Sequence, residues 1–313
     1  MSGHIPVLLN EIVEAIDPQD GDIIVDGTFG GGGYTKAILD KARCRVFGID
    51  RDPDAIDRGK ELSSQLDERL TMLKGCYGDM AALVNQKVNA VVLDIGVSSF
   101  QIDEADRGFS FREDGPLDMR MAQSGESAAD VVNTYAEKDI ADIIYKYGEE
   151  RRSRQVARAI IEARKEGDIT TTNQLAKIVR SVVWQAKDKI DPATRTFQGL
   201  RIYVNDELGE LERGLAAAEE ILKPGGRLVV VTFHSLEDRI VKKFFKERSG
   251  SMPRGNKYAP DLGDTGPKAS FKLINRKPIA PSDQENRANP RARSSKLRAG
   301  LRTEAPAWTG GDQ

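Results

Sequence analysis

The sequence has few of the residues that build cysteine- or histidine-based sites. Its 313 residues include only two cysteines, Cys44 and Cys76, and two histidines, His4 and His234. Two cysteines cannot form a disulfide framework or a thiolate metal cage. So few histidines also argue against a multi-histidine metal site or catalytic centre. We therefore expect no metal, and we expect both cysteines to be small core residues.

Long apolar segments are lacking too. No run approaches the roughly 18 apolar residues that a membrane span needs. Residues 1–11 contain no basic segment followed by an apolar core, which a secretory signal would have. Hydrophobic residues make up 39% and charged residues 31% of the chain, which is typical of a soluble globular protein and excludes a fibrous or wholly disordered one. We expect a cytoplasmic protein with one large domain and a sizeable addition, or with two domains.

Charge is distributed unevenly along the chain, although the net charge is only −2. Residues 1–150 contain 15 Lys+Arg and 29 Asp+Glu, whereas residues 151–313 contain 32 and 20. Such asymmetry indicates a localised anionic partner, most commonly nucleic acid, because Lys and Arg displace counterions from phosphates. The alternative is a chance gradient of solvated faces. The candidate phosphate-binding segments are 149–154 with Arg158, 242–246 and 287–302.

Apolar runs in the first hundred residues alternate with helical patterns. Runs at 23–25, 46–49, 70–73 and 90–93 predict buried parallel strands, and 34–39 and 53–66 predict helices between them. This alternation predicts an α/β fold with a doubly wound sheet. Between Asp94, which closes the fourth run, and a fifth run at 228–232 there are 133 intervening residues. A crossover needs only about a dozen residues, so something is inserted.

The inserted material has helical patterns at 140–147, 154–165, 173–185 and 192–222, after a loop-like stretch at 110–125. We predict a Rossmann-like domain over 1–109 and 201–302, with an inserted helical domain over 110–200 that recognises substrate. The last long helix would return the chain to the sheet. A short strand at 271–275 is predicted near the end. Residues 303–313 have the composition of a disordered tail.

The strongest local signal is the glycine-rich turn at 26–33, which follows a strand and precedes a helix. Dinucleotide, flavin and adenosyl-cofactor sites all use such a turn. Asp26, Asp50 and Asp94 each close a predicted strand, and parallel strands end at one edge of a sheet, so these carboxylates should gather there. Carboxylates oppose a pyrophosphate but attract the sulfonium and ammonium groups of S-adenosylmethionine. S-adenosylmethionine is therefore favoured, and an NAD-dependent oxidoreductase is an alternative.

Nine stretches carry a more specific signal. They are 4–11, 26–33, 48–53, 94–99, 107–112, 115–121, 196–202, 232–239 and 289–294. In this order they resemble the MraW/RsmH family of ribosomal RNA cytosine-N4 methyltransferases. The resemblance implies a class I methyltransferase fold. It also implies an S-adenosylmethionine-dependent enzyme that methylates the exocyclic N4 of a cytidine in the decoding region of 16S ribosomal RNA, within the small ribosomal subunit.

The resemblance also implies a set of cofactor-binding residues. They are Gly32, Gly33, Tyr34, Asp50, Tyr77, Asp94 and Gln101. Two positions depart from the family pattern: Tyr34-Thr35 stands where the family usually has His-Ser, and Phe100 stands where it usually has Pro. These departures affect the side chains at Tyr34 and beside Gln101, not the backbone contacts around them.

The chemistry of N4 methylation limits the catalytic candidates. The amine lone pair is delocalised into the ring, so the enzyme must orient the amine and accept hydrogen bonds from its protons. Methylation at carbon 5 would instead need a cysteine nucleophile. The Asp/Asn/Ser-Pro-Pro-aromatic motif of amino methyltransferases is absent at 94–99. Candidate acceptors are Asp118, His234 and Ser235. The alternatives are a salt bridge between Asp118 and Arg120, and a structural role for His234.

Several alternatives remain at this level. The chain could methylate another RNA, DNA or a protein, or it could be a ribosome-assembly factor that binds the cofactor without turnover. An oligomer is compatible with the sequence, which does not determine the number of subunits.

Overall fold

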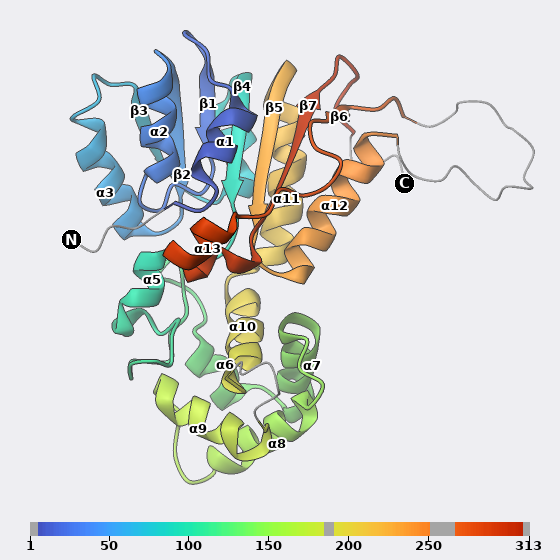
Figure 1. Cartoon of the computed structure of the whole chain (residues 1–313). Coiled ribbons are helices and arrows are strands. Elements are labelled where there is room, and N and C mark those ends of the chain that lie inside the picture. The colour runs from blue at the N-terminus through green and yellow to red at the C-terminus, as the bar shows by residue number, and fades with distance from the viewer. Residues whose placement is uncertain (1–5, 185–190, 251–266, 309–313) are drawn as a thin grey trace, which may run out of the picture. The chain divides into compact units, whose positions relative to one another are not determined.

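The chain consists of two compact units in a computed structural model, which describes residues 6–184, 191–250 and 267–308 (Figure 1). The sheet unit comprises Met1–Gly96 and Leu208–Gln313, and the helical unit comprises Val97–Glu207. The helical unit extends beyond the predicted insertion, 110–200, at both ends. Within the described ranges, no helix is both long enough and apolar enough to cross a membrane.

The sheet unit contains a seven-stranded sheet in the order β3-β2-β1-β4-β5-β7-β6. The strands are β1 (Ile23–Asp26), β2 (Arg45–Asp50), β3 (Leu70–Lys74), β4 (Val88–Asp94), β5 (Leu222–Thr232), β6 (Phe271–Leu273) and β7 (Lys296–Arg302). Strands β1 to β5 pair in parallel, and β7 is antiparallel to both neighbours. The predicted α/β fold with a doubly wound sheet is confirmed, and the strand order reverses between β1 and β4.

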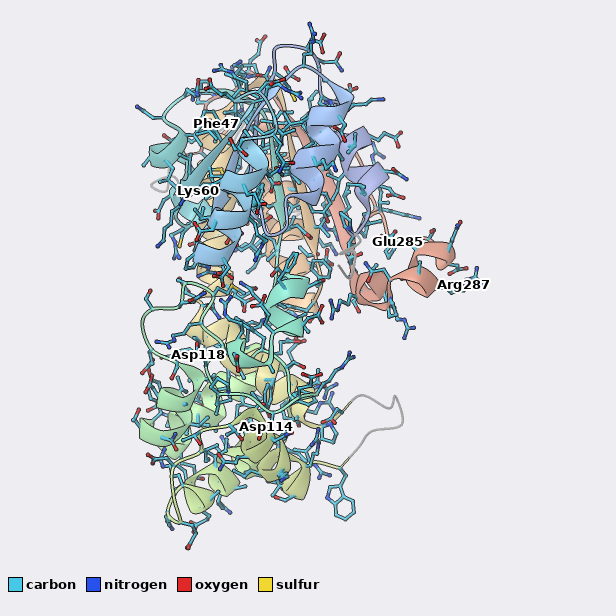
Figure 2. The ribbon with its side chains drawn as sticks, turned by 90° about the vertical axis from the view of Figure 1, so that its left-hand side faces the viewer. Phe47, Lys60, Asp114, Asp118, Glu285 and Arg287 are labelled. Carbon is cyan, nitrogen blue, oxygen red and sulfur yellow. The ribbon has the colours of Figure 1, made fainter. Side chains whose placement is uncertain are left out.

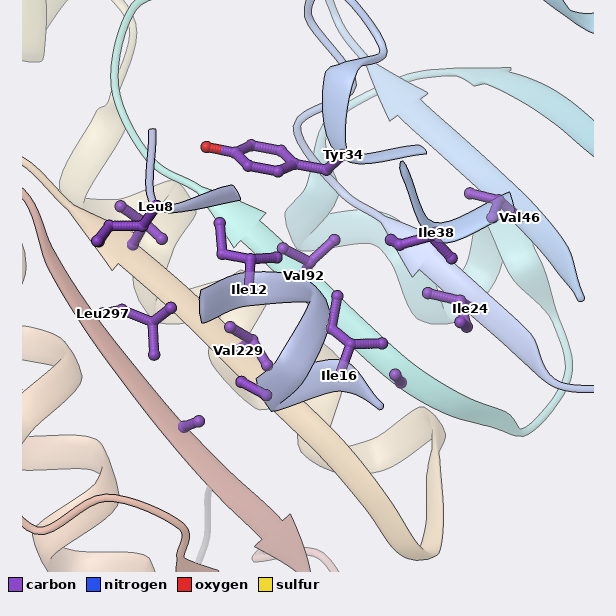
Figure 3. Close-up of a cluster of buried hydrophobic side chains, with 14 of the residues drawn as sticks. Leu8, Ile12, Ile16, Ile24, Tyr34, Ile38, Val46, Val92, Val229 and Leu297 are labelled. Atoms are coloured by element: carbon purple, nitrogen blue, oxygen red, sulfur yellow. The ribbon is translucent and has the colours of Figure 1, made fainter. Parts of the chain in front are cut away.

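Helices cover both faces of this sheet. They are α1 (Leu9–Ile16), α2 (Gly33–Lys41), α3 (Pro53–Ser63), α4 (Met80–Val84), α11 (Glu207–Ile221) and α12 (Ser235–Arg248). Helix α13 (Asp283–Ala288) has no buried residue. Neighbouring residues of one strand enter opposite clusters. Val92 packs with residues of α1 and α2 (Figure 3), whereas Val91 belongs to the other cluster, with residues of α4, α11 and α12. Because side chains alternate along a strand, burial of both faces requires the continuous apolar runs seen in the sequence.

The basic segment near the C-terminus is part of the sheet rather than a detached arm. Strand β7 pairs with β5 from Arg227↔Leu301 to Thr232↔Lys296. Arg302 is buried, and its guanidinium donates to the carbonyls of Glu219 and Ser270. Arg302 is therefore used inside the protein, because basic residues of β7 alternate with apolar ones that enter the core. Phosphate binding by the other basic residues of this segment stays a prediction.

The predicted tail also differs from the structure. Thr303 donates its backbone N–H to Ser270 O at 2.9 Å, and the Trp308 indole donates to Lys268 O at 3.0 Å. The indole also lies against the Arg248 guanidinium, 4.6 Å from the ring centroid. The prediction of disorder is thus wrong for 303–308, because these contacts hold the segment on the sheet unit. Residues 309–313 lie outside the described residues, as does most of the predicted loop at 249–267.

The helical unit has its own apolar core. Its helices are α5 (Ser99–Asp103), α6 (Ala128–Thr134), α7 (Glu137–Gly148), α8 (Ser153–Ala163), α9 (Thr172–Val182) and α10 (Ala193–Val204). Helices α7 and α10 approach closely at Gly148 and Gly199, where a Cβ on Gly148 would overlap the Arg195 carbonyl. The predicted helical character of the insertion agrees with these elements.

The predicted long helix at 192–222 is wrong, since the chain forms two helices, α10 and α11. Asp206 between them adopts a left-handed conformation with φ 46°. The Asn205 side chain accepts the Met121 backbone N–H at 2.8 Å and donates to Met119 O at 2.7 Å. These bonds to a distant loop stabilise the break, and local helical periodicity contains no sign of them.

Candidate functional site

Three aspartates end adjacent strands at one edge of the sheet. Asp26, at the end of β1, is in register with Gly48 of β2 and Val92 of β4. Asp50 and Asp94 therefore lie two residues farther along β2 and β4, on either side of Asp26. Asp26 is fully buried, whereas Asp50 and Asp94 are partly exposed. The structure thus brings together the three carboxylates that the strand pattern predicted.

Asp26 anchors the glycine-rich turn. Its Oδ2 accepts a hydrogen bond from the Thr35 hydroxyl at 2.7 Å, and its Oδ1 accepts one from Thr28 N at 3.4 Å. Burial raises its pKa to about 6, although the Thr35 and Thr28 bonds oppose that shift. Both carboxylate oxygens are directed to the protein itself, so Asp26 shapes the site from beneath.

Asp50 faces the same turn from the neighbouring strand. Its oxygens accept the backbone N–H of Gly30 at 2.8 Å and of Asp52 at 2.9 Å. Gly30 has a φ of 52°, a conformation that glycine adopts without steric cost. Burial raises the Asp50 pKa, while the two backbone hydrogen bonds lower it. Two backbone N–H groups thus hold the carboxylate, and the residue as a whole remains partly exposed.

Asp94 has a different environment. Its backbone N–H donates to the Thr28 hydroxyl at 2.7 Å, and its Oδ2 lies 3.0 Å from the Tyr34 hydroxyl. Its Oδ1 is buried and has no hydrogen-bond partner among the described residues. Burial raises the Asp94 pKa to about 7, and the charges of Asp26 and Glu237 add to that shift while the Tyr34 bond opposes it. A buried acceptor without a partner costs about 1–3 kcal/mol, so the site favours a ligand that would pair with it.

Gly32 and Gly33, the two glycines predicted to bind the cofactor, are packed closely against neighbouring side chains. A Cβ on Gly33 would overlap Pro6, and one on Gly32 would lie 2.7 Å from the Phe29 ring. Gly32 precedes α2 and contributes no side-chain cap. Side chains larger than hydrogen would therefore displace the turn, and the beginning of α2 remains available to backbone contacts.

Tyr34 is buried and its phenol is used internally. The hydroxyl donates to Val7 O at 2.8 Å and is also within reach of Asp94. Leu8 follows Val7 in the chain, and its backbone N–H donates to the Glu285 side chain of α13 at 2.7 Å. Figure 2 shows Glu285 on α13. The sequence did not identify this link, because it joins segments almost 280 residues apart in the chain.

Tyr77 follows β3 in a short 3-10 helix, Tyr77–Asp79. Its ring packs against Gly214 of α11, where a Cβ would overlap it, and its Cβ lies 3.2 Å from the position of a Cβ on Gly27. Glu210 of α11 accepts the Gly78 N–H at 2.7 Å. Tyr77 thus lies beside the glycine-rich turn, Glu210 supports the neighbouring Gly78, and contact of Tyr77 with the cofactor stays a prediction. The signal for Glu210 was weak, because one glutamate on a helix is usually solvated.

Two predicted residues belong to the helical unit. Gln101 is buried and completes a capping box: its Oε1 accepts Ser98 N at 3.1 Å, and Ser98 Oγ accepts Gln101 N at 3.2 Å. Asp118 accepts hydrogen bonds from Arg120 N and Nε, both at 2.9 Å, and Figure 2 shows it in this unit. Burial opposes ionisation of Asp118, but the Arg120 contacts outweigh it and lower the pKa.

His234 and Ser235 lie where β5 ends and α12 begins. His234 is the N-cap of α12, and its Nδ1 accepts the Glu237 N–H at 3.4 Å. Its Nε2 lies 2.9 Å from Glu237 Oε1 without the geometry of a hydrogen bond. Glu237 is fully buried and accepts the Phe233 N–H at 2.7 Å. These contacts give His234 a structural role, whereas Ser235 is exposed.

Both cysteines lack the environment of a nucleophile. Cys44 is buried and its thiol lies 3.8 Å from Ile38 O, while Cys76 is half-buried. Burial raises the pKa of each thiol. Nucleophilic cysteines need a lowered pKa, so the geometry agrees with a reaction that uses no cysteine.

The basic helix α8 contributes to a surface pocket of the helical unit. Arg152 and Arg158 line this pocket of about 530 Å³ together with Trp184, whose side chain is 80% exposed. An exposed aromatic ring beside guanidinium groups suits stacking of a base and pairing with phosphate. The basic segment 242–246, on α12, contributes to a second pocket on the sheet unit.

Comparisons with known proteins identify the family of this chain. A sequence model of the MraW methylase family matches residues 1–302. The relative named ribosomal RNA small subunit methyltransferase H from Paramagnetospirillum magneticum is 58% identical over 97% of each chain. Its namesake from Rhodospirillum rubrum is 52% identical over 99% of this chain and 97% of the relative.

A solved structure described as a putative rRNA-methylase from Clostridium thermocellum is 15% identical, covers 96% of this chain and 100% of that chain, and aligns with a TM-score of 0.44. The family match covers nearly the whole chain and includes the glycine-rich turn and all three strand-end aspartates. This protein therefore belongs to the MraW methylase family.

Proposed function

We propose that this protein transfers the methyl group of S-adenosylmethionine to the exocyclic N4 of a cytidine in the decoding region of 16S ribosomal RNA. One observation carries the proposal: Asp50 and Asp94 flank the glycine-rich turn at the carboxyl edge of the sheet, in a chain of the MraW methylase family. Its relatives, 52% to 58% identical, are named for ribosomal RNA small subunit methylation.

The residues present suit this cofactor. The buried Oδ1 of Asp94 has no hydrogen-bond partner in the described ranges. The charges that act most on Asp94 are those of Asp26 and Glu237, and both are acidic. A cationic ligand would supply the missing partner and offset the charge, whereas a pyrophosphate would be repelled. When bound, S-adenosylmethionine supplies an electrophilic methyl group on its sulfonium.

Each predicted cofactor residue has a role in the proposal. The turn at Gly32 and Gly33 lets the backbone approach the ligand, and Asp50 accepts the ribose hydroxyls, as strand-end carboxylates do in nucleoside sites. Tyr77 flanks the ligand beside this turn. Tyr34 acts through its phenol on Asp94 and is a positioning residue. Gln101 is kept as a cofactor residue on the family resemblance alone.

The acceptor for the N4 protons is proposed among Asp118, His234 and Ser235. Asp118 is ionised at neutral pH because its pKa is lowered, so it can accept a hydrogen bond, although Arg120 already occupies both of its oxygens. Ser235 is exposed at the end of β5. His234 caps α12, which favours a positioning role. Orientation of the amine toward the methyl group is the main task of the site, since the amine loses a proton readily once it has been alkylated.

The charge distribution supports a polyanionic substrate, and the names of the relatives support ribosomal RNA. Residues 151–313 carry an excess of 12 basic over acidic residues, from 32 Lys+Arg and 20 Asp+Glu. The pocket at Arg152, Arg158 and Trp184 suits unstacked RNA, and the target base must leave any stack at a cost of a few kcal/mol. We place the reaction in the cytoplasm, on the small ribosomal subunit.

The proposal is tested on small ribosomal subunits from cells that lack this protein. The protein is added with labelled S-adenosylmethionine, and the digested RNA is analysed by mass spectrometry. We expect N4-methylcytidine. A label on another nucleoside would overturn the acceptor, and cofactor binding without transfer to subunits or naked RNA would favour a non-catalytic assembly factor.

A further inference from the structure

A cationic pocket lies on the sheet unit between α12 and the β6–β7 hairpin. Lys242 and Lys246 come from α12, Arg276 follows β6, and Arg298 belongs to β7. Phe245 and Leu273 line the same pocket and provide apolar contacts. We call this the α12 pocket. Its volume is about 140 Å³. No residue of the proposed cofactor site lines it.

Most of its charge is not neutralised by the protein. Lys242, Lys246 and Arg276 are exposed and have neither an ion pair nor a side-chain hydrogen bond to any residue within the described ranges. Arg298 donates to Asp238 at 2.8 Å, and Lys296 shares that same carboxylate at 3.0 Å.

The neighbouring residue of α12 behaves differently. Lys243 is 3.8 Å from Glu247, so its charge has a partner. Three unpaired cations that converge on one hollow repel one another, and an anion bound among them would relieve that repulsion. The uneven pairing along α12 therefore distinguishes this pocket from an ordinary solvated face.

The size of the pocket limits its occupant. Sites for small molecules usually occupy about 300–1,000 Å³, so a hollow of about 140 Å³ does not enclose a nucleotide or a metabolite. It suits one compact anionic group. The aliphatic stems of Lys242 and Lys246 can pack along the apolar wall while their ammonium groups reach the ligand.

Its place in the fold connects it to the proposed reaction. Lys242 lies eight residues after His234, so it is about 12 Å farther along α12 from the carboxyl edge of the sheet. A polyanion that enters the proposed active site could thus reach the pocket with a neighbouring group. A phosphodiester is the anionic group that such a polymer presents at every residue.

We propose that the α12 pocket binds a backbone phosphate of the RNA substrate and thereby anchors the RNA on the sheet unit. This inference rests on the proposed function, because it takes RNA as the polyanion. Phosphate contacts position a nucleic acid without reading its sequence. The pocket therefore contributes to affinity and register, and the choice of cytidine lies elsewhere.

The test compares two variants that remove the same charge. Lys242→Gln/Lys246→Gln empties the pocket of its α12 cations, and Lys243→Gln/Lys272→Gln removes two exposed cations outside it. Binding of a decoding-region RNA fragment is measured over a range of salt concentrations. The logarithm of the RNA association constant falls linearly with the logarithm of the salt concentration. We expect this dependence to be shallower by about one in the pocket variant, which corresponds to about tenfold weaker binding at 0.1 M salt. The control variant should retain the wild-type slope.

Each outcome decides the matter. Equal losses of RNA affinity in both variants, or no loss in the pocket variant, would overturn the proposal. Binding of inorganic phosphate is measured as well, and a pocket variant that binds phosphate more weakly but RNA normally would also overturn it. Cofactor affinity, measured by calorimetry, should stay at the wild-type value in both variants and shows that they are folded. If the wild-type protein binds RNA through this pocket but methylates no cytidine, the proposed function fails and the anchor stands. If it methylates cytidine and the pocket variant binds RNA normally, the anchor fails alone.

Discussion

The phenol of Tyr34 connects Asp94 to the backbone of Val7, with the hydroxyl oxygen 3.0 Å from Asp94 Oδ2 and 2.8 Å from Val7 O. A phenol has one proton, so it cannot donate to both acceptors at once. Both contacts are satisfied when Asp94 is protonated and donates to the phenol oxygen while Tyr34 donates to Val7. Burial raises the pKa of Asp94 to about 7, so the protonated form predominates below neutral pH and makes up about half of the ligand-free protein near pH 7.

Cofactor binding should therefore release a proton from Asp94. A cationic ligand favours the ionised carboxylate, so S-adenosylmethionine affinity should rise with pH up to about 7 and then level off. Calorimetry in two buffers of different ionisation enthalpy measures the proton released at pH 6.5 (chosen as roughly half a unit below that pKa). Asp94→Asn should abolish this release, and an unchanged release in that variant would contradict the assignment.

Stability should fall as pH rises through the acidic range. Asp26 and Asp94 have pKa values of about 6 and about 7, above the ordinary value of 3.8. Between about pH 4 and pH 7 the folded protein binds more protons than the unfolded chain. The contribution of these two carboxyls to the free energy of unfolding is therefore complete below that pH range and lost above it. For Asp26 the shift corresponds to about 3 kcal/mol. Denaturant unfolding of wild type and Asp26→Asn from pH 5 to 7.5 should show a smaller dependence in the variant.

Tyr34→Phe should destabilise the protein and weaken cofactor binding. The ring still fills its place in the core, but Val7 O and Asp94 lose their partner, which costs about 1–3 kcal/mol. Thermal and denaturant unfolding measure the loss. Tyr145→Phe is a matched control, since Tyr145 is 63% exposed on α7. If both variants unfold alike, the buried phenol contributes nothing through these bonds.

Asp50→Ala should weaken S-adenosylmethionine binding at least tenfold, because it removes the proposed acceptor of the ribose hydroxyls. Tenfold corresponds to about 1.4 kcal/mol, the lower end for a hydrogen bond to a charged group. Asp40→Ala, at an exposed position of α2, is the control. Calorimetry checks affinity, and circular dichroism checks that both variants are folded. Unchanged affinity in a folded Asp50→Ala protein would refute the role.

Removal of residues 286–313 should prevent stable folding rather than merely weaken RNA binding. The truncation deletes β7, which lies between β5 and β6 and contributes Leu297 and Ala299 to the buried core. Differential scanning calorimetry should show no cooperative transition. A cooperative transition with reduced RNA affinity would instead make this segment a detachable basic arm.

Local patterns were sufficient where one physical requirement dominated. Strands buried on both faces need unbroken apolar runs, so β1, β2, β3 and β4 were predicted close to their observed bounds. The same reasoning missed β7, because Lys296, Arg298 and Arg302 make its sequence look like a polar tail. Its apolar residues only gain a partner once β5 and α12 are in place.

Residue roles depended on partners far away in the chain. Asp94 was predicted as a site residue from the end of its strand, but nothing local indicated that Tyr34 would share a proton with it. Asn205 ends α10 through bonds to Met119 and Met121. Asp118 was weighed between catalysis and a salt bridge with Arg120, and the structure contains that salt bridge.

By itself, the sequence determined the α/β class, the glycine-rich turn, the three strand-end aspartates and membership of the MraW methylase family. These properties depend on residue type and on short spacings, and both can be read directly from the sequence. Only the tertiary structure decided that the Tyr34 phenol contacts Asp94, that the basic C-terminal segment forms strand β7 inside the sheet, and that three unpaired cations line one pocket. Those outcomes depend on which distant side chains meet and which of them are left without a partner, and packing alone determines that.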